Sequence, residues 1–110
     1  MLMDVNPQEA LNIIEENCNN SNFIVLDVRT PAEFNEDHIK GAVLLDYYSA
    51  NFKDELEKLN KDNFYLIYCR SGVRSKSAMD LMSIMGFKEI YNLLGGIMRW
   101  KTMGLPTVIP

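Results

Sequence analysis

The stretch Phe64–Gly86, FYLIYCRSGVRSKSAMDLMSIMG, decides the fold predicted for this chain of 110 residues. It begins with an unbroken apolar run, Phe64–Tyr68, rich in aromatic and branched side chains, as expected of a strand buried on both faces. A short polar segment follows, and a helix is predicted from Ser75 to a stop at Gly86. Its apolar positions recur at helical spacing: Ala78, Leu81, Met82 and Met85.

A cysteine stands where the predicted strand ends. Cys69 is followed by the polar, glycine-containing segment Arg70–Arg74, which cannot continue the strand. The carboxyl end of a buried strand, next to a helix start, is where open α/β sheets bind ligands. Amides at a helix start carry partial positive charge, and Gly72 allows a positive φ, so that loop N–H groups can converge on an anion. The sequence therefore predicts an anion-binding loop around Cys69.

The charges in this loop favour a reactive cysteine over a structural one. Arg70 and Arg74 lie within five residues of the sulfur, and positive charge and loop amides both stabilise a thiolate. We therefore predict a pKa for Cys69 below that of a free cysteine. A structural cysteine would lie in neutral, apolar surroundings instead.

The segment Cys69–Ser75, CRSGVRS, resembles the active-site loop of single-domain rhodaneses, the sulfurtransferases that carry sulfur as a cysteine persulfide. Leu26–Phe34 with His38–Ala42 is similar to the upstream signature of that family. Leu94–Gly96, Trp100 and Gly104–Pro106 are similar to its carboxyl end. The resemblance spans about Asn6 to Pro106 and implies that Cys69 is catalytic. The donor-binding residues that it implies are Arg70, Ser71, Gly72, Val73, Arg74 and Ser75.

Cysteine phosphatases built on the same architecture are the main alternative. Their loop resembles this one but places five residues between the cysteine and a phosphate-gripping arginine. Here four residues separate Cys69 from Arg74, and the next residue, Ser75, has no guanidinium. A shorter loop makes a tighter nest, which suits a terminal sulfur better than a tetrahedral phosphate.

Composition indicates one ordinary domain over residues 1–110. The net charge of −4 argues against general binding to nucleic acid, and no apolar stretch approaches the length of a membrane span. The amino-terminal residues do not read as a secretory signal, and two cysteines are too few for a disulfide framework. A cytoplasmic location is expected. No cluster of cysteine and histidine has metal-ligand spacing, so neither a metal nor another cofactor is expected.

Strands and helices alternate along the rest of the chain. This alternation predicts an α/β fold with a mostly parallel sheet covered on both faces, and the resemblance implies five strands. Strands are predicted at Phe23–Leu26, Ala42–Leu45, Phe64–Tyr68 and Glu89–Leu93. Helices are predicted to begin at the caps Asn6, Thr30 and Ser49, and at Gly95–Gly96.

Four other polar or nucleophilic residues have two interpretations each. Asp27 and Arg29 would support the loop from the end of their strand, or form an ion pair with Arg29 free to meet Glu33 or Glu36. His38 is the only histidine, but its segment is structural in the resembling family, so we predict that it is not a base. Cys18 falls on the apolar face of the first helix and is predicted to be a core residue rather than a resolving thiol.

Two functions remain open at this stage. The first is an enzyme that moves sulfur from thiosulfate, through a Cys69 persulfide, to cyanide, a thiol or a partner protein. The second is a persulfide carrier or sensor module that acts on a partner protein with little thiosulfate turnover. Both use the same loop, so the sequence separates them poorly.

Overall fold

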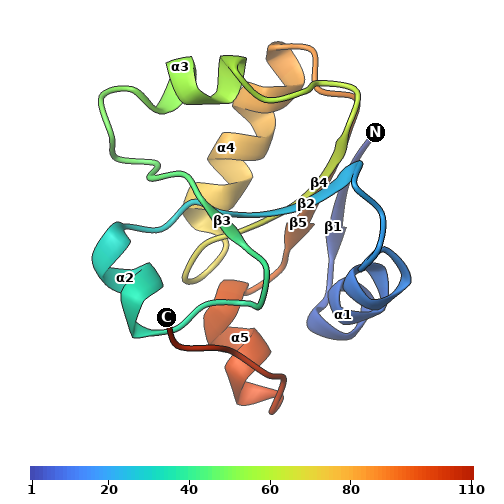
Figure 1. Ribbon diagram of the computed structural model, residues 1–110, viewed down its shortest axis with the longest axis vertical. Helices are drawn as coiled ribbons and strands as arrows, with labels where there is room; N and C mark the ends of the chain where they lie inside the picture. Colours follow the sequence, from blue (N-terminus) through green and yellow to red (C-terminus); the bar gives the residue numbers. More distant parts are fainter.

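The computed structural model describes all residues, 1–110, and its centre is a five-stranded sheet (Figure 1). The strand order is β1-β5-β4-β2-β3, and every neighbouring pair is parallel. The predicted α/β fold, with a five-stranded parallel sheet and helices on both faces, is confirmed. The strands are β1 (Leu2–Val5), β2 (Phe23–Asp27), β3 (Val43–Leu44), β4 (Phe64–Tyr68) and β5 (Glu89–Leu93). The helices are α1 (Pro7–Glu16), α2 (Pro31–Glu36), α3 (Phe52–Glu57), α4 (Val73–Ile84) and α5 (Gly96–Thr102).

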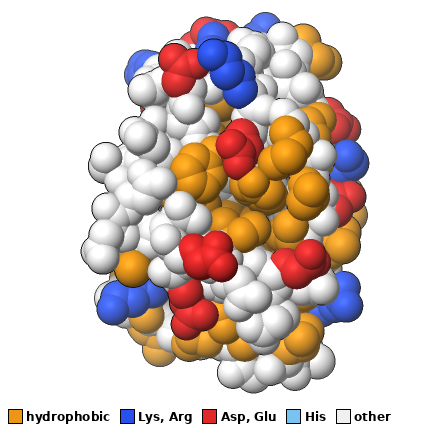
Figure 2. Space-filling view, turned by 90° about the vertical axis from the view of Figure 1, so that its right-hand side faces the viewer, with side chains coloured by type: hydrophobic (Ala, Val, Ile, Leu, Met, Phe, Trp, Pro, Cys, Tyr) orange, Lys and Arg blue, Asp and Glu red, His pale blue; other side chains and the backbone are white.

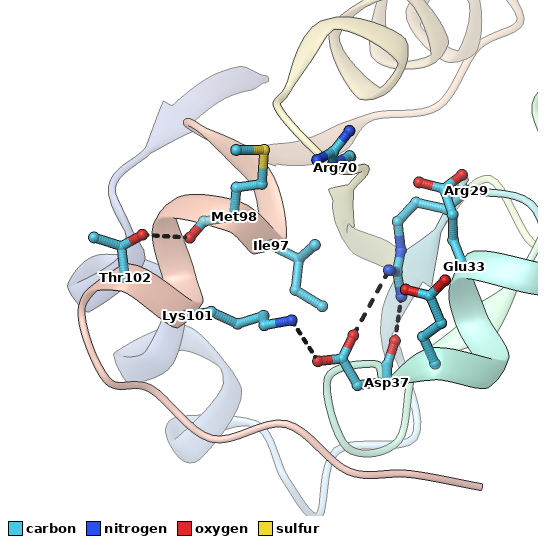
Figure 3. A pocket seen from close by; sticks show the side chains of 9 residues that line it. Arg29, Glu33, Asp37, Arg70, Ile97, Met98, Lys101 and Thr102 are labelled. Atoms are coloured by element: carbon cyan, nitrogen blue, oxygen red, sulfur yellow. Dashed lines mark hydrogen bonds and ion pairs between the residues drawn. The ribbon is translucent and has the colours of Figure 1, made fainter.

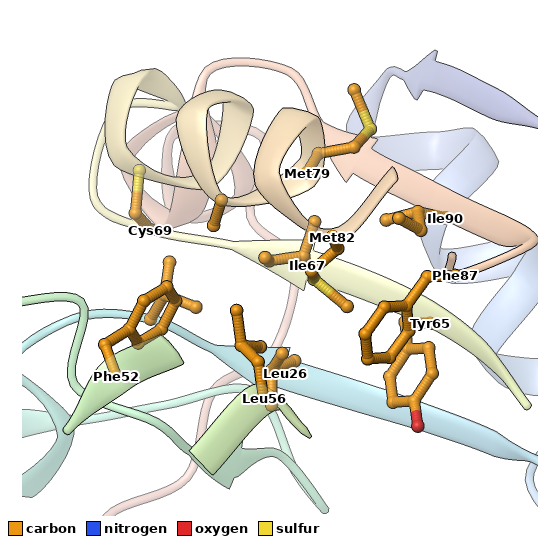
Figure 4. Packing of buried hydrophobic residues seen from close by; sticks show 12 residues of the cluster. Leu26, Phe52, Leu56, Tyr65, Ile67, Cys69, Met79, Met82, Phe87 and Ile90 are labelled. Atoms are coloured by element: carbon orange, nitrogen blue, oxygen red, sulfur yellow. The ribbon is translucent and has the colours of Figure 1, made fainter. Parts of the chain in front are cut away.

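Two hydrophobic clusters cover the two faces of the sheet. Along β4 successive side chains point to opposite faces, so Tyr65 and Ile67 lie in one cluster and Leu66 and Tyr68 in the other. The first cluster includes residues of α3 and α4 and contains Cys69 (Figure 4). The second includes residues of α1 and α5. A strand buried on both faces explains the unbroken apolar run that the sequence shows.

Capping residues fix where the first two helices begin. Asn6 and Glu9 form a reciprocal capping box at α1, and Thr30 and Glu33 form another at α2, as predicted. The start of α3 differs from the prediction, because it follows Asn51 and has no side-chain cap; Ser49 lies in the turn before it. α4 begins at Val73, two residues earlier than predicted, because the residue before it is a left-handed glycine that serves as its cap.

Two sequence predictions about the amino-terminal third are wrong or incomplete. Cys18 is exposed rather than in the core, because α1 ends at Glu16 and the chain leaves its apolar face in a turn. The sequence did not locate β1, an edge strand with four residues that pairs with β5.

Figure 2 views the molecule from the side of α1 and β1 and shows hydrophobic side chains gathered between carboxylates. No helix is both long enough and apolar enough to cross a membrane.

Candidate active site

The loop that joins β4 to α4 folds around the sulfur of Cys69. We call residues Cys69–Ser75 the Cys69 loop. The backbone N–H of Gly72 donates to Cys69 Sγ at 3.1 Å, and the N–H of Ser75 donates at 3.4 Å. Gly72 has φ +101°, which turns its amide inward and which a residue with a side chain would adopt only with strain. The arrangement is the nest of amides expected for an anion.

The hydroxyl of Ser75 adds a third polar contact to the sulfur. Ser75 Oγ lies 3.4 Å from Cys69 Sγ and donates its own proton to the carbonyl of Gly72 at 3.2 Å. A protonated thiol can therefore donate to this oxygen. When the thiol ionises, the hydroxyl can turn its proton toward the sulfur instead. One serine thus has a hydrogen-bonding role for both protonation states of Cys69.

Cys69 has both of the environments that were treated as alternatives from the sequence: apolar surroundings and polar groups that stabilise a thiolate. The residue is 1% exposed and its side chain packs in the first hydrophobic cluster (Figure 4). This burial raises the pKa of the thiol. The hydrogen bonds from the side chain and amide of Ser75, and from the amides of Gly72 and Ser71, more than offset it, so the pKa of Cys69 lies below its ordinary value.

Arg74 is held by an ion pair with α2. Its two terminal nitrogens bind the two carboxylate oxygens of Glu33 at 2.8 and 2.9 Å, and its guanidinium lies 5.4 Å from the ring centre of Tyr48. The hydrogen bonds from Arg74 lower the pKa of Glu33 to about 2, and Glu33 in turn raises the pKa of Arg74. Arg74 therefore links the Cys69 loop to α2 and is not a free cation, whereas from the sequence Arg70 and Arg74 were expected to act alike.

Arg70 is the exposed cation of the loop. It forms no ion pair and lines a cavity of about 600 Å³ between α2 and α5 (Figure 3). In this cavity Lys101 of α5 forms an ion pair with Asp37 at 2.8 Å, and Met98 of α5 lies on the side of Arg70. The other residues of the predicted donor-binding set, Ser71 and Val73, are exposed beside the loop.

Asp27 and Arg29 form a buried pair at the carboxyl end of β2. Asp27 is fully buried and accepts from the backbone N–H and the guanidinium of Arg29 at 2.8 to 3.1 Å. Arg29 also donates to the carbonyl of Asp37 at 2.6 Å. Burial lowers the pKa of Arg29, but the hydrogen bond to Asp27 and the charge of Asp27 raise it, and the pKa of Arg29 lies above its ordinary value. The ion pair that the sequence left as one alternative is therefore present, but Arg29 binds Asp27 and Asp37 rather than Glu33 or Glu36, because Glu33 binds Arg74.

The start of α5 is tied to the backbone of the Cys69 loop. The N–H groups of Ile97 and Met98 donate to the carbonyls of Cys69 and Arg70 at 2.9 and 3.0 Å. The approach is so close at Gly96 that a β-carbon there would lie 2.3 Å from the Arg70 carbonyl oxygen. From the sequence, Gly96 was a helix start within the segment similar to the family, and Glu33 was a cap or a possible partner of Arg29. The contacts of Gly96 and Glu33 with the Cys69 loop were not predicted.

His38 takes no part in this arrangement. Its Nδ1 lies 3.1 Å from the carbonyl oxygen of Phe34 and its ring stacks on that of Phe34, with ring centres 3.8 Å apart. It is not a hydrogen-bond partner of Cys69 Sγ, whose contacts are with Gly72 and Ser75. These contacts leave His38 the structural role predicted for it.

The profile of the family described as "Rhodanese-like domain" matches residues 6–103 of the chain. The chain belongs to the rhodanese-like domain family. Within this rhodanese-like domain, the matched residues include all of the Cys69 loop and the buried pair at the end of β2.

Curated relatives and solved structures agree with this assignment. The rhodanese-like domain is 32% identical over 106 residues to a sulfurtransferase of Allochromatium vinosum, across 96% of this chain and 97% of the relative. It is 35% identical over 79 residues to the thiosulfate sulfurtransferase GlpE of Coxiella burnetii, across 72% of each. The crystal structure of a rhodanese-related protein from Thermoplasma volcanium matches with a TM-score of 0.81 and 27% identity, across 98% of this chain and 99% of that one. The family is therefore one of sulfurtransferases, as the resemblance implied.

Proposed function

We propose that this rhodanese-like domain moves a sulfane sulfur from thiosulfate, or a similar donor, to a thiophilic acceptor through a persulfide on Cys69. The observation that carries the proposal is the convergence of two loop amides and the Ser75 hydroxyl on Cys69 Sγ, within 3.1 to 3.4 Å. The same donors that favour a thiolate can hold the negative charge of a persulfide. Residues 1–110 would act as one domain, and the chemistry needs no cofactor.

The reaction has two displacement steps. The Cys69 thiolate attacks the outer sulfur of thiosulfate, a bond forms between the two sulfur atoms, and sulfite leaves with the electron pair of the broken S–S bond. An acceptor such as cyanide, a small thiol or a protein thiol then attacks the outer sulfur and releases Cys69 as a thiolate. Covalent catalysis of this kind gives ping-pong kinetics. Because the thiolate must stay free between cycles, a reducing compartment such as the cytoplasm fits the mechanism.

The loop geometry favours sulfur over phosphate transfer. At the position where the phosphatases place an arginine, Ser75 brings a hydroxyl and an amide to within 3.4 Å of the sulfur. The only arginine inside the helix start, Arg74, is engaged by Glu33. A phosphate ester would therefore lack, at this position of the loop, the arginine that grips its oxygens in the phosphatases.

Intact-mass measurement after incubation with thiosulfate tests the intermediate. We expect the protein to gain one sulfur atom, and we expect the Cys69→Ala variant to gain none and to lose turnover with cyanide. The exposed thiol of Cys18 makes Cys18→Ala the matched control, and it should behave as the parent protein. Substantial turnover by Cys69→Ala would end the proposed mechanism.

Arg70 would steer the anionic donor, because it is the exposed and unpaired cation of the loop. Reversing one charge near a dianion at a partly exposed site costs about 1 to 2 kcal/mol. We therefore expect Arg70→Glu to raise the KM for thiosulfate about 10-fold with little effect on thermal stability. Lys40→Glu, an exposed and unpaired position on another part of the surface, is the control. An unchanged KM in Arg70→Glu would remove this role.

A further inference from the structure

A cavity of about 420 Å³ opens at the edge of the sheet, beside the first residues of β2. Its apolar walls come from three elements: Ile14 of α1, Phe23 and Ile24 of β2, and Val43 of β3. The exposed Cys18 also lines it. Ligand sites in proteins have this size and this character, with mostly apolar walls and a few polar groups that orient the ligand. The polar groups of this cavity therefore indicate what it holds.

The backbone of β2 has open groups on the side of this cavity. The ladder hydrogen bonds of a parallel strand alternate between its two neighbours. The carbonyl of Asp27 accepts from the N–H of Leu45, which follows β3, so Asp27 and every second residue before it turn their backbone groups toward the β3 side. Because β3 begins only at Val43, the carbonyl of Phe23 and the N–H of Val25 have no strand opposite them.

The N–H of Val25 is a buried donor without a hydrogen-bond partner. Val25 is 6% exposed, and no carbonyl of the turn that precedes β3 accepts from this N–H. By contrast, the N–H of Phe23 on the same edge donates to the carbonyl of Asn20 at 3.1 Å. Buried backbone donors are almost always paired, so this one marks a place for an acceptor.

The open part of this edge is one residue long. Asn20 occupies the edge before the Phe23 carbonyl, and Val43 occupies it after the Val25 N–H. A chain that pairs here as a parallel strand donates one N–H to Phe23 and offers one oxygen to Val25. The next residue of that chain would run into Val43, so the chain has to end at this point.

The charge of the cavity fits a chain that ends here. Lys40, in the turn before β3, is the only charged residue that lines the cavity, and no carboxylate lines it. Lys40 is exposed and forms no ion pair. A terminal carboxylate that accepts from the Val25 N–H can therefore also accept from an ammonium group, and charge-assisted hydrogen bonds are the strong ones.

We propose that this cavity binds the carboxyl-terminal residue of an extended chain of a partner protein, and that this residue has an apolar side chain. Its N–H donates to the carbonyl of Phe23, its carboxylate accepts from the N–H of Val25 and the ammonium of Lys40, and its side chain packs on the apolar walls. The Cys69 loop follows the carboxyl end of β4, which is parallel to β2, so the two sites lie at opposite ends of the sheet. The protein can therefore hold a partner without closing the Cys69 loop.

Short peptides followed by the NMR signals of the backbone amides test this chemistry. The probe is acetyl-Gly-Ser-Leu with a free carboxylate. One control peptide has a carboxyl-terminal amide, a second ends in glycine, and a third ends in N-methylleucine, which cannot donate to Phe23. We expect the amide proton signal of Val25 to move downfield on titration, and the probe to bind at least about 10-fold more tightly than each control. Equal affinity of the four peptides, or a Val25 signal that does not move, would overturn the proposal.

The thiol of Cys18 reports occupancy of the cavity by a second method. Because Cys18 lines the cavity, a saturating concentration of the probe should slow its alkylation by iodoacetamide several-fold. Alkylation of Cys69, resolved in the same sample by mass spectrometry, should keep its rate. Protection of both thiols, or of neither, contradicts binding at this cavity.

Variants of the lining locate the two parts of the interaction. Lys40→Gln should weaken binding of the probe about 10-fold and leave binding of the amide control unchanged. Lys53→Gln removes another exposed and unpaired lysine and is the matched control. Val43→Ser should reduce the advantage of leucine over glycine, whereas Ile84→Ser, at an exposed position of α4, should not. Effects of equal size in the controls would refute this assignment of the site.

Turnover with cyanide separates this inference from the proposed function, on which it does not depend. Saturating probe should leave cyanide turnover unchanged, and the probe should still bind to Cys69→Ala. Absence of cyanide turnover in the parent protein would refute the proposed function and leave the binding test intact. A dimer in light scattering that the probe dissociates would assign this edge to a second copy of the chain and overturn the proposal.

Discussion

Ser75 shows how much one hydroxyl can control at the scale of a residue. Its oxygen lies 3.4 Å from the sulfur of Cys69 and accepts from the thiol, while its own proton is donated to the Gly72 carbonyl. We predict that Ser75→Ala raises the pKa of Cys69, because the remaining amides must offset burial alone. The rate of alkylation of Cys69 with iodoacetamide should rise with pH through a midpoint higher than that of the parent protein.

The sign of this pH dependence follows from the direction of the shift. The folded protein holds the thiol pKa below its unfolded value, so the thiolate contributes stability above the unfolded pKa, and this contribution is lost as pH falls through the folded pKa. Ser77→Ala is the matched control, because Ser77 is exposed in the same turn of α4 and does not contact the sulfur. An unchanged midpoint in Ser75→Ala would show that the hydroxyl does not stabilise the thiolate.

Gly96 supports a second prediction at this scale. A β-carbon there would lie 2.3 Å from the Arg70 carbonyl oxygen and 2.6 Å from that of Cys69. Gly96→Ala must therefore move the loop or α5, and overpacking of this kind costs about 1 to 3 kcal/mol. We expect lower thermal stability and a large loss of sulfur transfer. Gly104 also has a positive φ, but a β-carbon there would meet no atom within 4 Å. Gly104→Ala is therefore the control, and it should retain activity.

At the scale of elements, the link between α2 and the Cys69 loop is the ion pair of Glu33 with Arg74. Glu33→Gln keeps a side chain that can complete the capping box with Thr30 but removes the charge. We predict a loss of about 1 kcal/mol in the free energy of unfolding at neutral pH, since the pair is partly exposed. Urea unfolding measures this loss, and Glu36→Gln on the same helix should leave the free energy of unfolding unchanged.

Acid should remove the same contribution from the parent protein. The folded pKa of Glu33 is about 2, below its unfolded value of about 4.3, so the stabilisation is present above the unfolded pKa and disappears as pH falls toward 2. The difference in stability between the parent protein and Glu33→Gln should therefore shrink across that interval. A difference that stays constant down to pH 2 would contradict the assignment.

Elements with strong local signals were the ones that the sequence predicted well. β4 has the predicted bounds because a strand buried on both faces is a continuous apolar run. β5 also has the predicted bounds, and α1 and α2 begin at the predicted caps. β1 was missed because an edge strand with three exposed residues needs no apolar pattern. Pairings between distant residues, such as Arg74 with Glu33, were missed because each partner already had a sufficient local explanation.

In the candidate site, too, local features were predicted from the sequence and contacts between distant segments were not. The position of Cys69 at a strand end and the need for a glycine at Gly72 are local properties, and both were predicted from the sequence. The engagement of Arg74 and the tether from α5 depend on how separate segments meet. The exposure of Cys18 depended on where a helix stops, which its apolar spacing did not reveal.

At the scale of the whole molecule, β4 joins the two hydrophobic clusters. Leu66 and Ile67 are neighbours in this strand, both fully buried, and they point into opposite clusters. We predict that Leu66→Ala and Ile67→Ala each cost about 2 to 5 kcal/mol. Because both clusters share this strand, each variant should still unfold in a single transition by fluorescence and circular dichroism. Two separate transitions in either variant would show that the faces of the sheet unfold independently.

The pairing of β1 with β5 has a consequence for how the protein is made. Of the five strands of this sheet, Leu2–Val5 is synthesised before the others, and its partner Ile90–Leu93 belongs to the strand that is synthesised after the others. Until then the side chains of β1 have no sheet to join, and long-range pairing of this kind closes slowly. The sheet can therefore be completed at this edge only after β5 has been synthesised, so β1 cannot be protected by its native pairing while the intervening strands are made.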